Sequence, residues 1–211
     1  MSWTHVNGAC NKGGTTSYTL TLGFTPAAGN LLLVAAEVGV GSIGISDNSS
    51  GPADVWANIV PAFTWDAGTG TFAAWATVVT NGTAPTTVTI TPGGAVLADN
   101  YTGGPGVVLQ DGAAATLTGA GTGPSVNYTT GAKAGDLLWS VVAIAGAGTC
   151  TVASPFTIRT YTTQNLGSSD DAGVSASTKY TVTYTIGNYN WAVFTVGLNS
   201  TFPARARAII F

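Results

Sequence analysis

Apolar and polar positions alternate over short segments of this chain. In residues 17–24 every second side chain is apolar, which predicts a strand with one buried face. Residues 31–38 are almost continuously apolar and are typical of a central strand buried on both faces. Seven further segments have strand character, namely residues 72–80, 86–91, 107–109, 125–129, 137–144, 180–186 and 191–198. Turn residues separate them and no window has the period of an amphipathic helix, so the pattern predicts an all-β, two-sheet antiparallel β-sandwich.

The composition favours sheets over helices. Hydrophobic residues make up 45% of the 211 residues and charged residues only 7%, against about 25% in ordinary soluble proteins. The polar surface therefore consists largely of Thr, Ser, Asn and Gly, which suit strands and turns better than helices. The six Lys and Arg residues are mostly scattered and the net charge is −3, which argues against a nucleic acid partner. A surface with so few charges makes more sense if neighbouring subunits cover much of it.

One internal similarity relates the two halves of the chain. Residues 28–36, Ala-Gly-Asn-Leu-Leu-Leu-Val-Ala-Ala, resemble residues 134–142, Ala-Gly-Asp-Leu-Leu-Trp-Ser-Val-Val. The rest of the halves does not align, so we expect a single β-sandwich domain over residues 1–201. Equivalent strands of two facing four-stranded sheets would give this similarity, as in a jelly roll. The Gly-rich residues 112–124 between the halves form a long connection or an edge region.

The C-terminal tail, residues 202–211, differs from the rest and ends in Ile209, Ile210 and Phe211. An apolar terminus of this kind either folds back on its domain or docks on a partner, so these three residues are the candidate docking segment. The beginning of the chain lacks the basic and apolar regions of a signal peptide. Its longest apolar runs are too short to span a bilayer, so no membrane is expected as a partner.

Motifs that carry chemistry are few. Residues 39–44 fit G-x-G-x-x-G, but a loop follows them where a dinucleotide site needs a helix. His5 is the only histidine and the nine acids are scattered, so we expect no catalytic residues, no metal site and no cofactor. Glu37 lies within an apolar strand and is expected to face solvent. Asp47, Asn48 and Asp54 offer oxygen ligands for calcium, but capping of turns is the favoured interpretation.

The remaining candidates are two cysteines and several aromatic residues. Whether Cys10 and Cys150 pair stays open. The tryptophans within strands are expected in the core. Trp56 and Trp65 fall in what reads as a long loop over residues 46–70, and Tyr189 lies in a hairpin turn. These three could stack on sugar rings, but contact with a partner or packing of loops is favoured.

The order of certain segments resembles a known kind of module. The segments are Ala28–Ala35, Phe72–Ala76 (Phe-Ala-Ala-Trp-Ala), Thr86–Ile90 (Thr-Thr-Val-Thr-Ile) and Ala134–Leu138. In pattern and order the chain resembles the jelly-roll-like β-sandwich module of bacteriophage virion proteins and bacterial surface proteins. The resemblance implies virion decoration, head or tail fibres, or binding of receptors and glycans, and it carries no catalytic residues.

These observations together predict a non-enzymatic virion structural protein, a capsid decoration or minor head or fibre protein that acts through subunit assembly. Its expected partners are other virion proteins and further copies of itself. The expected localisation is the virion, assembled in the host cytoplasm, because no signal peptide and no disulfide-rich cysteine pattern indicate secretion. The alternative is a lectin-like module that binds carbohydrate or a receptor.

Overall fold

The computed structural model describes residues 3–49, 54–80, 84–104, 107–108, 110–129, 133–146, 148–161, 165–172, 174–176 and 179–199. The N-terminal half contains β1 (Thr4–Gly13), β2 (Tyr18–Thr21), β3 (Leu31–Gly39), β4 (Gly44–Asp47), β5 (Ala57–Trp65), the 3-10 turn η1 (Asp66–Gly68), β6 (Gly70–Val78), β7 (Thr87–Thr91) and β8 (Gly94–Thr102). The C-terminal half contains β9 (Ala115–Gly121), β10 (Ser125–Tyr128), β11 (Leu137–Ile144), β12 (Thr151–Val152), β13 (Thr157–Tyr161), β14 (Leu166–Ala172), β15 (Tyr180–Thr185) and β16 (Tyr189–Leu198).

The strands of each half form one five-stranded and one three-stranded antiparallel sheet. In the N-terminal half the orders are β1-β8-β3-β6-β5 and β2-β7-β4, and in the C-terminal half they are β13-β14-β11-β16-β9 and β10-β15-β12. The prediction of an all-β sandwich is confirmed, but the described strands form four sheets where two were expected. The sequence pattern missed β1, β5, β8 and β14, because each contains Gly, Pro, Ser or Asp, which interrupt the apolar pattern from which strands are predicted.

Each half has the strand order of a jelly roll. In the first half β1 pairs with β8, β2 with β7 and β3 with β6, as in one long hairpin that has been rolled up. In the second half β9 pairs with β16, β10 with β15 and β11 with β14, so each strand has an equivalent eight strands earlier. The similar segments found in the sequence lead into β3 and β11, the middle strands of the two five-stranded sheets. The internal similarity therefore marks a repeated topology.

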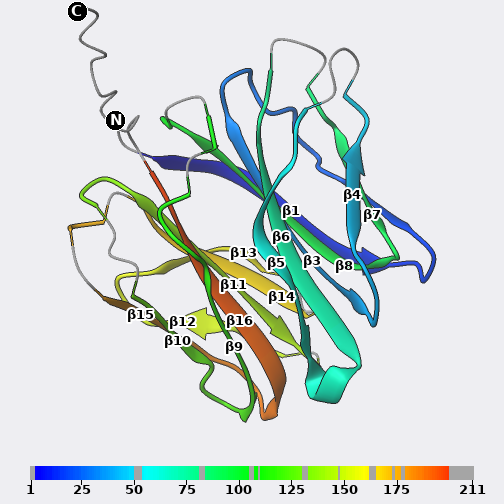
Figure 1. Cartoon of the computed structure of the whole chain (residues 1–211), viewed down its shortest axis with the longest axis vertical. Helices are drawn as coiled ribbons and strands as arrows, with labels where there is room; N and C mark the ends of the chain where they lie inside the picture. Colours follow the sequence, from blue (N-terminus) through cyan, green and yellow to red (C-terminus); the bar gives the residue numbers. More distant parts are fainter. Residues whose placement is uncertain are drawn as a thin grey trace, which may run out of the picture.

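Figure 1 shows how the strands of the two halves are arranged, and apolar side chains form three cores between the four sheets. Leu32 and Val34 of β3 face the outer sheet of their own half, whereas Leu31 and Leu33 face the core between the two five-stranded sheets. Both faces of β3 are thus buried, which explains its continuous apolar sequence. Trp139 on β11 lies in the same central core and is fully buried. Since the halves share this core, neither five-stranded sheet exposes its inner face.

The packing of the two five-stranded sheets has an approximate two-fold character. Strand β13, the fifth strand of its half, contacts β1 and β8, which are the first and eighth strands of theirs. Strand β5, the fifth strand of the first half, contacts β16 and shares a cleft with β9, the eighth and first strands of the second half. Such reciprocal contact is the geometry of an isologous dimer, here within one chain. The expected tail, with Ile209, Ile210 and Phe211, lies outside the described residues.

Candidate functional site

The three aromatic residues proposed for loop contact or sugar stacking lie in three different environments. Trp65 ends β5 and is only 4% exposed, within the central core. Trp56 precedes β5, packs beside the outer core of its half and donates its indole N–H to Asp47 at 2.7 Å. Tyr189 begins β16 and is partly buried against the outer core of the second half. They therefore do not form a common stacking surface.

The predicted long loop over residues 46–70 is wrong, because it contains β5. Pro61 made this segment look unlike a strand, since proline cannot donate a hydrogen bond to a neighbouring strand. β5 is the edge strand of its sheet, where proline is tolerated, and its pairing with β6 has two register shifts. Register shifts of this kind bend a strand, so β5 is poorly shaped to pair with a further strand.

Of the residues considered for calcium, Asp47 caps a local turn, as the favoured interpretation predicted, whereas Asn48 and Asp54 hold segments that are distant in the sequence. Asp47 accepts hydrogen bonds from the backbone N–H of Ser49 at 2.8 Å and from the indole of Trp56. Asn48 accepts from the backbone of residues 86 and 87, and Asp54 accepts from the backbone and hydroxyl of Thr80. Among the described residues, no group of three His, Cys, Asp or Glu side chains is placed to hold a metal ion.

The remaining sequence motifs are also accounted for. Residues 39–44 form an exposed turn between β3 and β4, and no helix follows them. Cys10 and Cys150 are unpaired, and burial raises the pKa of the Cys150 thiol to about 12. Glu37 was expected to face solvent, but it is partly buried at the end of β3. Burial raises the pKa of Glu37, an effect that the charge of nearby Lys12 opposes.

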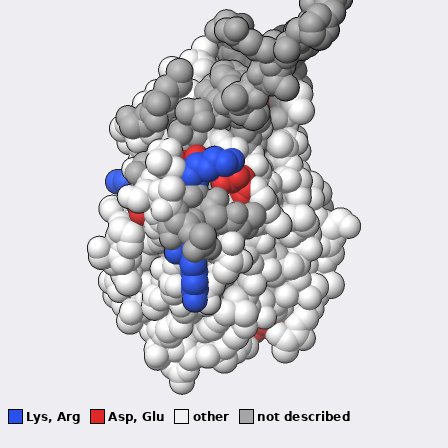
Figure 2. Space-filling model, turned by 60° about the vertical axis from the view of Figure 1, so that its left-hand side comes forward, with Lys and Arg blue, Asp and Glu red and all other residues white. Residues whose placement is uncertain are grey.

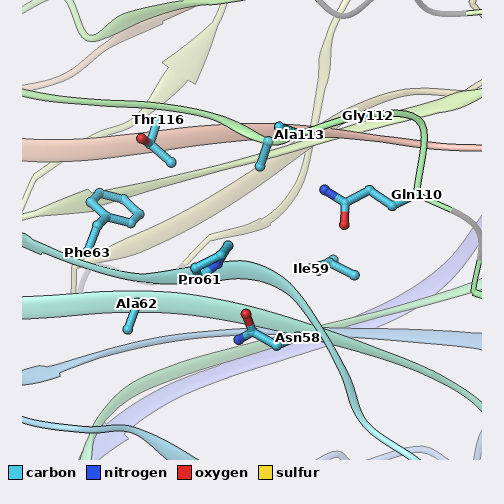
Figure 3. Close-up of a pocket in the computed structure, with 10 residues that line it drawn as sticks. Asn58, Ile59, Pro61, Ala62, Phe63, Gln110, Gly112, Ala113 and Thr116 are labelled. Atoms are coloured by element: carbon cyan, nitrogen blue, oxygen red, sulfur yellow. The ribbon is translucent and has the colours of Figure 1, made fainter.

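A cleft of about 500 Å³ lies between the edge strands β5 and β9 (Figure 3). One side is lined by Asn58, Ile59, Pro61, Ala62 and Phe63, and the other by Gln110, Gly112, Ala113, Ala114 and Thr116. The lining is mostly apolar, with two side-chain amides and one hydroxyl as its polar groups. None of these described lining residues has a side chain that titrates near neutral pH.

At the opposite end of the central interface, a buried polar cluster closes the gap between the halves. Its centre is Asp99 on β8, whose side chain is fully buried. The Asp99 carboxylate accepts hydrogen bonds from the Trp139 indole at 2.9 Å and from the Thr160 hydroxyl at 2.5 Å, both in the second half. His5 Nε2 lies 3.2 Å from the same carboxylate oxygen that Thr160 contacts. One carboxylate thus joins β8 to β11 and β13.

A second buried acid lies on the neighbouring strand β14. Arg159 donates from Nε to Asp170 at 2.7 Å. Burial raises the pKa of Asp170, an effect that nearby Tyr101 and Arg159 oppose. Gly8 on β1 leaves room for the cluster, because a Cβ there would lie 1.9 Å from the Thr160 hydroxyl. The polar groups therefore fill this end of the interface closely.

The cluster contains the residue types of a catalytic triad in a different arrangement. In a triad the hydroxyl contacts the histidine, which the carboxylate orients. Here the Thr160 hydroxyl and His5 both contact the carboxylate of Asp99, so the histidine is not placed between the other two. This geometry is suited to holding the two halves together. Sequence reasoning missed it, although an acid between apolar residues in the segment Ala95–Asn100 is a recognisable signal.

The exposed surface is weakly charged. Figure 2 shows one face on which a basic side chain lies beside acidic ones and most of the described surface is uncharged. Strand β9 is part of the uncharged surface, and residues 116–120 along it are all exposed. Among the described residues, no helix is long and apolar enough to cross a membrane.

Comparisons with known proteins give no family for this chain. No family model, no curated protein and no solved structure matches it.

Proposed function

We propose that this chain is a non-enzymatic structural protein of a bacteriophage particle, a capsid decoration or minor head or fibre protein that acts by binding neighbouring subunits. The observation that carries the proposal is the uncharged edge strand β9 beside the mostly apolar cleft, on a scaffold of two fused jelly rolls. Jelly rolls occur in viral capsid domains and in lectins.

The buried acids support assembly over catalysis. Asp99 and Asp170 have the burial expected of catalytic acids, but their hydrogen bonds link strands of the two halves or neighbouring strands of one sheet. The cleft has no titratable lining residue. Surface contact is therefore the activity for which this geometry is best suited.

The C-terminal tail is the proposed docking segment of this protein. The last described strand ends beside the cleft, because Leu198 forms an isolated bridge with Gln110, which lines it. The described part of the chain therefore ends close to the cleft. From there Ile209, Ile210 and Phe211 would reach an adjacent virion subunit.

Quantitative mass spectrometry of purified particles from the source that encodes the chain tests this function. We expect the protein at a fixed copy number relative to the major capsid protein, and its absence from the particles would overturn the proposal. A chain truncated after residue 201 should fold normally and bind stripped particles at least tenfold more weakly than the full chain. Equal binding by both would contradict the role of the tail, and glycan binding that is lost in Trp56→Ala would favour the lectin-like alternative.

A further inference from the structure

The edges of the four sheets are not equally protected against pairing with another strand. An exposed edge has unpaired backbone groups, and proteins protect such edges with charges, proline, bulges or short strands. Three edge strands have a charged residue or a proline: β1 has Lys12, β5 has Pro61 and β13 has Arg159. Each of them also has a register shift against its neighbour. Strands β2, β4 and β10 have four residues each, and β12 has two.

Strand β9 has none of these protections. Its seven residues, Ala-Thr-Leu-Thr-Gly-Ala-Gly, include no charge and no proline. They pair with β16 without a register shift. Leu117 is 47% exposed on this strand. Among the described edges, β9 is therefore the long and regular one that is open to another strand.

We infer that β9 pairs with β9 of a second copy of this chain, in antiparallel orientation about a two-fold axis. The sheet β13-β14-β11-β16-β9 would then continue across the dimer. Two identical strands are compatible here because neither has a charge that would repel its mate. A second copy also needs no partner whose sequence complements β9, since an isologous contact uses the same patch twice.

The two faces of β9 make this pairing self-complementary. Gly119 faces the outer core, because a Cβ there would lie 2.6 Å from the Trp191 ring. Strand alternation places Leu117 on the same face and Thr116 on the face that lines the cleft. In a pairing centred on Thr118, Leu117 lies directly opposite Gly119 of the second copy. The leucine then lies beside the Trp191 ring, which covers Gly119.

The pairing of β9 identifies the surface through which the proposed assembly protein would bind a second copy of itself. This inference rests on the proposed function only for the place where the dimer would form, the virus particle. Two paired strands of seven residues form a small interface, so the dimer should be weak and concentration-dependent. In a particle, many neighbouring contacts would add to it.

Sedimentation velocity of the full chain over a wide concentration range tests the inference. We expect wild type to shift from monomer to dimer with rising concentration, and Thr118→Lys to raise the dimer dissociation constant at least tenfold. Ser46→Lys is the matched control, because it puts the same charge on the short edge strand β4, and it should dimerise like wild type. A wild-type chain that stays monomeric, or a Thr118→Lys variant that dimerises normally, would overturn the inference.

Oxidative cross-linking keeps the test decisive if Thr118→Lys does not fold by circular dichroism. Thr118→Cys should form a dimer that reducing agent dissociates, since the two residues lie opposite each other at the two-fold axis. Failure to cross-link at concentrations where wild type dimerises would refute the β9 pairing. A monomeric protein that is nevertheless present in particles would overturn this pairing and leave the proposed function intact.

Discussion

Replacing Asp99 with alanine removes the carboxylate that joins the two jelly-roll units. The side chain is fully buried, and its oxygens accept hydrogen bonds from Trp139 and Thr160 of the other half. Alanine leaves both donors in the protein interior without an acceptor. The contact with His5 is lost as well.

The loss in the free energy of unfolding comes from the two buried donors that Asp99→Ala leaves without an acceptor. A buried donor without a partner costs about 1–3 kcal/mol, so the indole and the hydroxyl together cost about 2–6 kcal/mol. The whole free energy of unfolding of a domain is about 5–15 kcal/mol, so this is a large part of it. At this chain length a loss of 4 kcal/mol lowers Tm by roughly 8–16 °C.

Urea unfolding followed by tryptophan fluorescence measures the effect, because Trp139 is itself in the interface. Asp99→Asn is the matched control, since its amide oxygen still accepts from the indole, and it should lose less than half as much stability as Asp99→Ala. The reasoning is refuted if Asp99→Ala loses less than about 1 kcal/mol, or if both variants lose the same amount.

Three further predictions concern packing, pH and thiols. Gly8→Ala should lower the free energy of unfolding by about 1–3 kcal/mol, because its methyl group collides with the polar cluster. Gly123→Ala, at a site with open space around it, should change the free energy of unfolding by less than about 0.5 kcal/mol. Equal effects of the two substitutions would contradict the packing around Gly8. Burial raises the pKa of Glu37, so its charged form destabilises the fold as the pH rises through that pKa. Glu37→Gln should therefore raise Tm at pH 7 and leave it unchanged near pH 3, while a lower Tm at pH 7 would show that pairing with a cation outweighs burial. Cys10 and Cys150 should not react with a thiol reagent in the native protein, because burial raises the pKa of each thiol. Both should react in denaturant. Rapid labelling of the native protein would contradict their burial.

The central strands could be predicted from the sequence because they are buried on both faces. Residues 137–144 were predicted as a strand and form β11 with the same limits, and β3 extends one residue beyond the predicted 31–38. A continuous apolar run bounded by turns is sufficient for such strands. The tryptophans expected in the core, Trp75, Trp139 and Trp191, are buried.

The strands β8 and β14 were missed because polar residues lie at buried positions. Asp99 and Asn100 of β8, and Ser168 and Asp170 of β14, are buried and hydrogen-bonded within or between the sheets. In sequence these letters are typical of turns. Their partners lie on other strands of the same half or, for Asp99, in the other half, so no local pattern supplies these partners.

The cleft depends on the same pairing. Phe63 and Thr116 lie far apart in sequence and line one cleft only because β5 and β9 meet across the central interface. The residues 112–124 were expected to form a connection or an edge region, and they contain the edge strand β9. That β9 lacks protection against pairing with another strand could be recognised only by comparison with the other edge strands of the structure.

Hydrogen–deuterium exchange of the full wild-type chain at low and high protein concentration tests the assembly account most directly. The account predicts that backbone amides in residues 115–121 exchange more slowly at high concentration, because pairing with a second copy satisfies them. The amides of β4, an edge strand of the outer sheet, should exchange at the same rate at both concentrations. Unchanged exchange in β9 at concentrations where the protein is dimeric would contradict assembly through this edge.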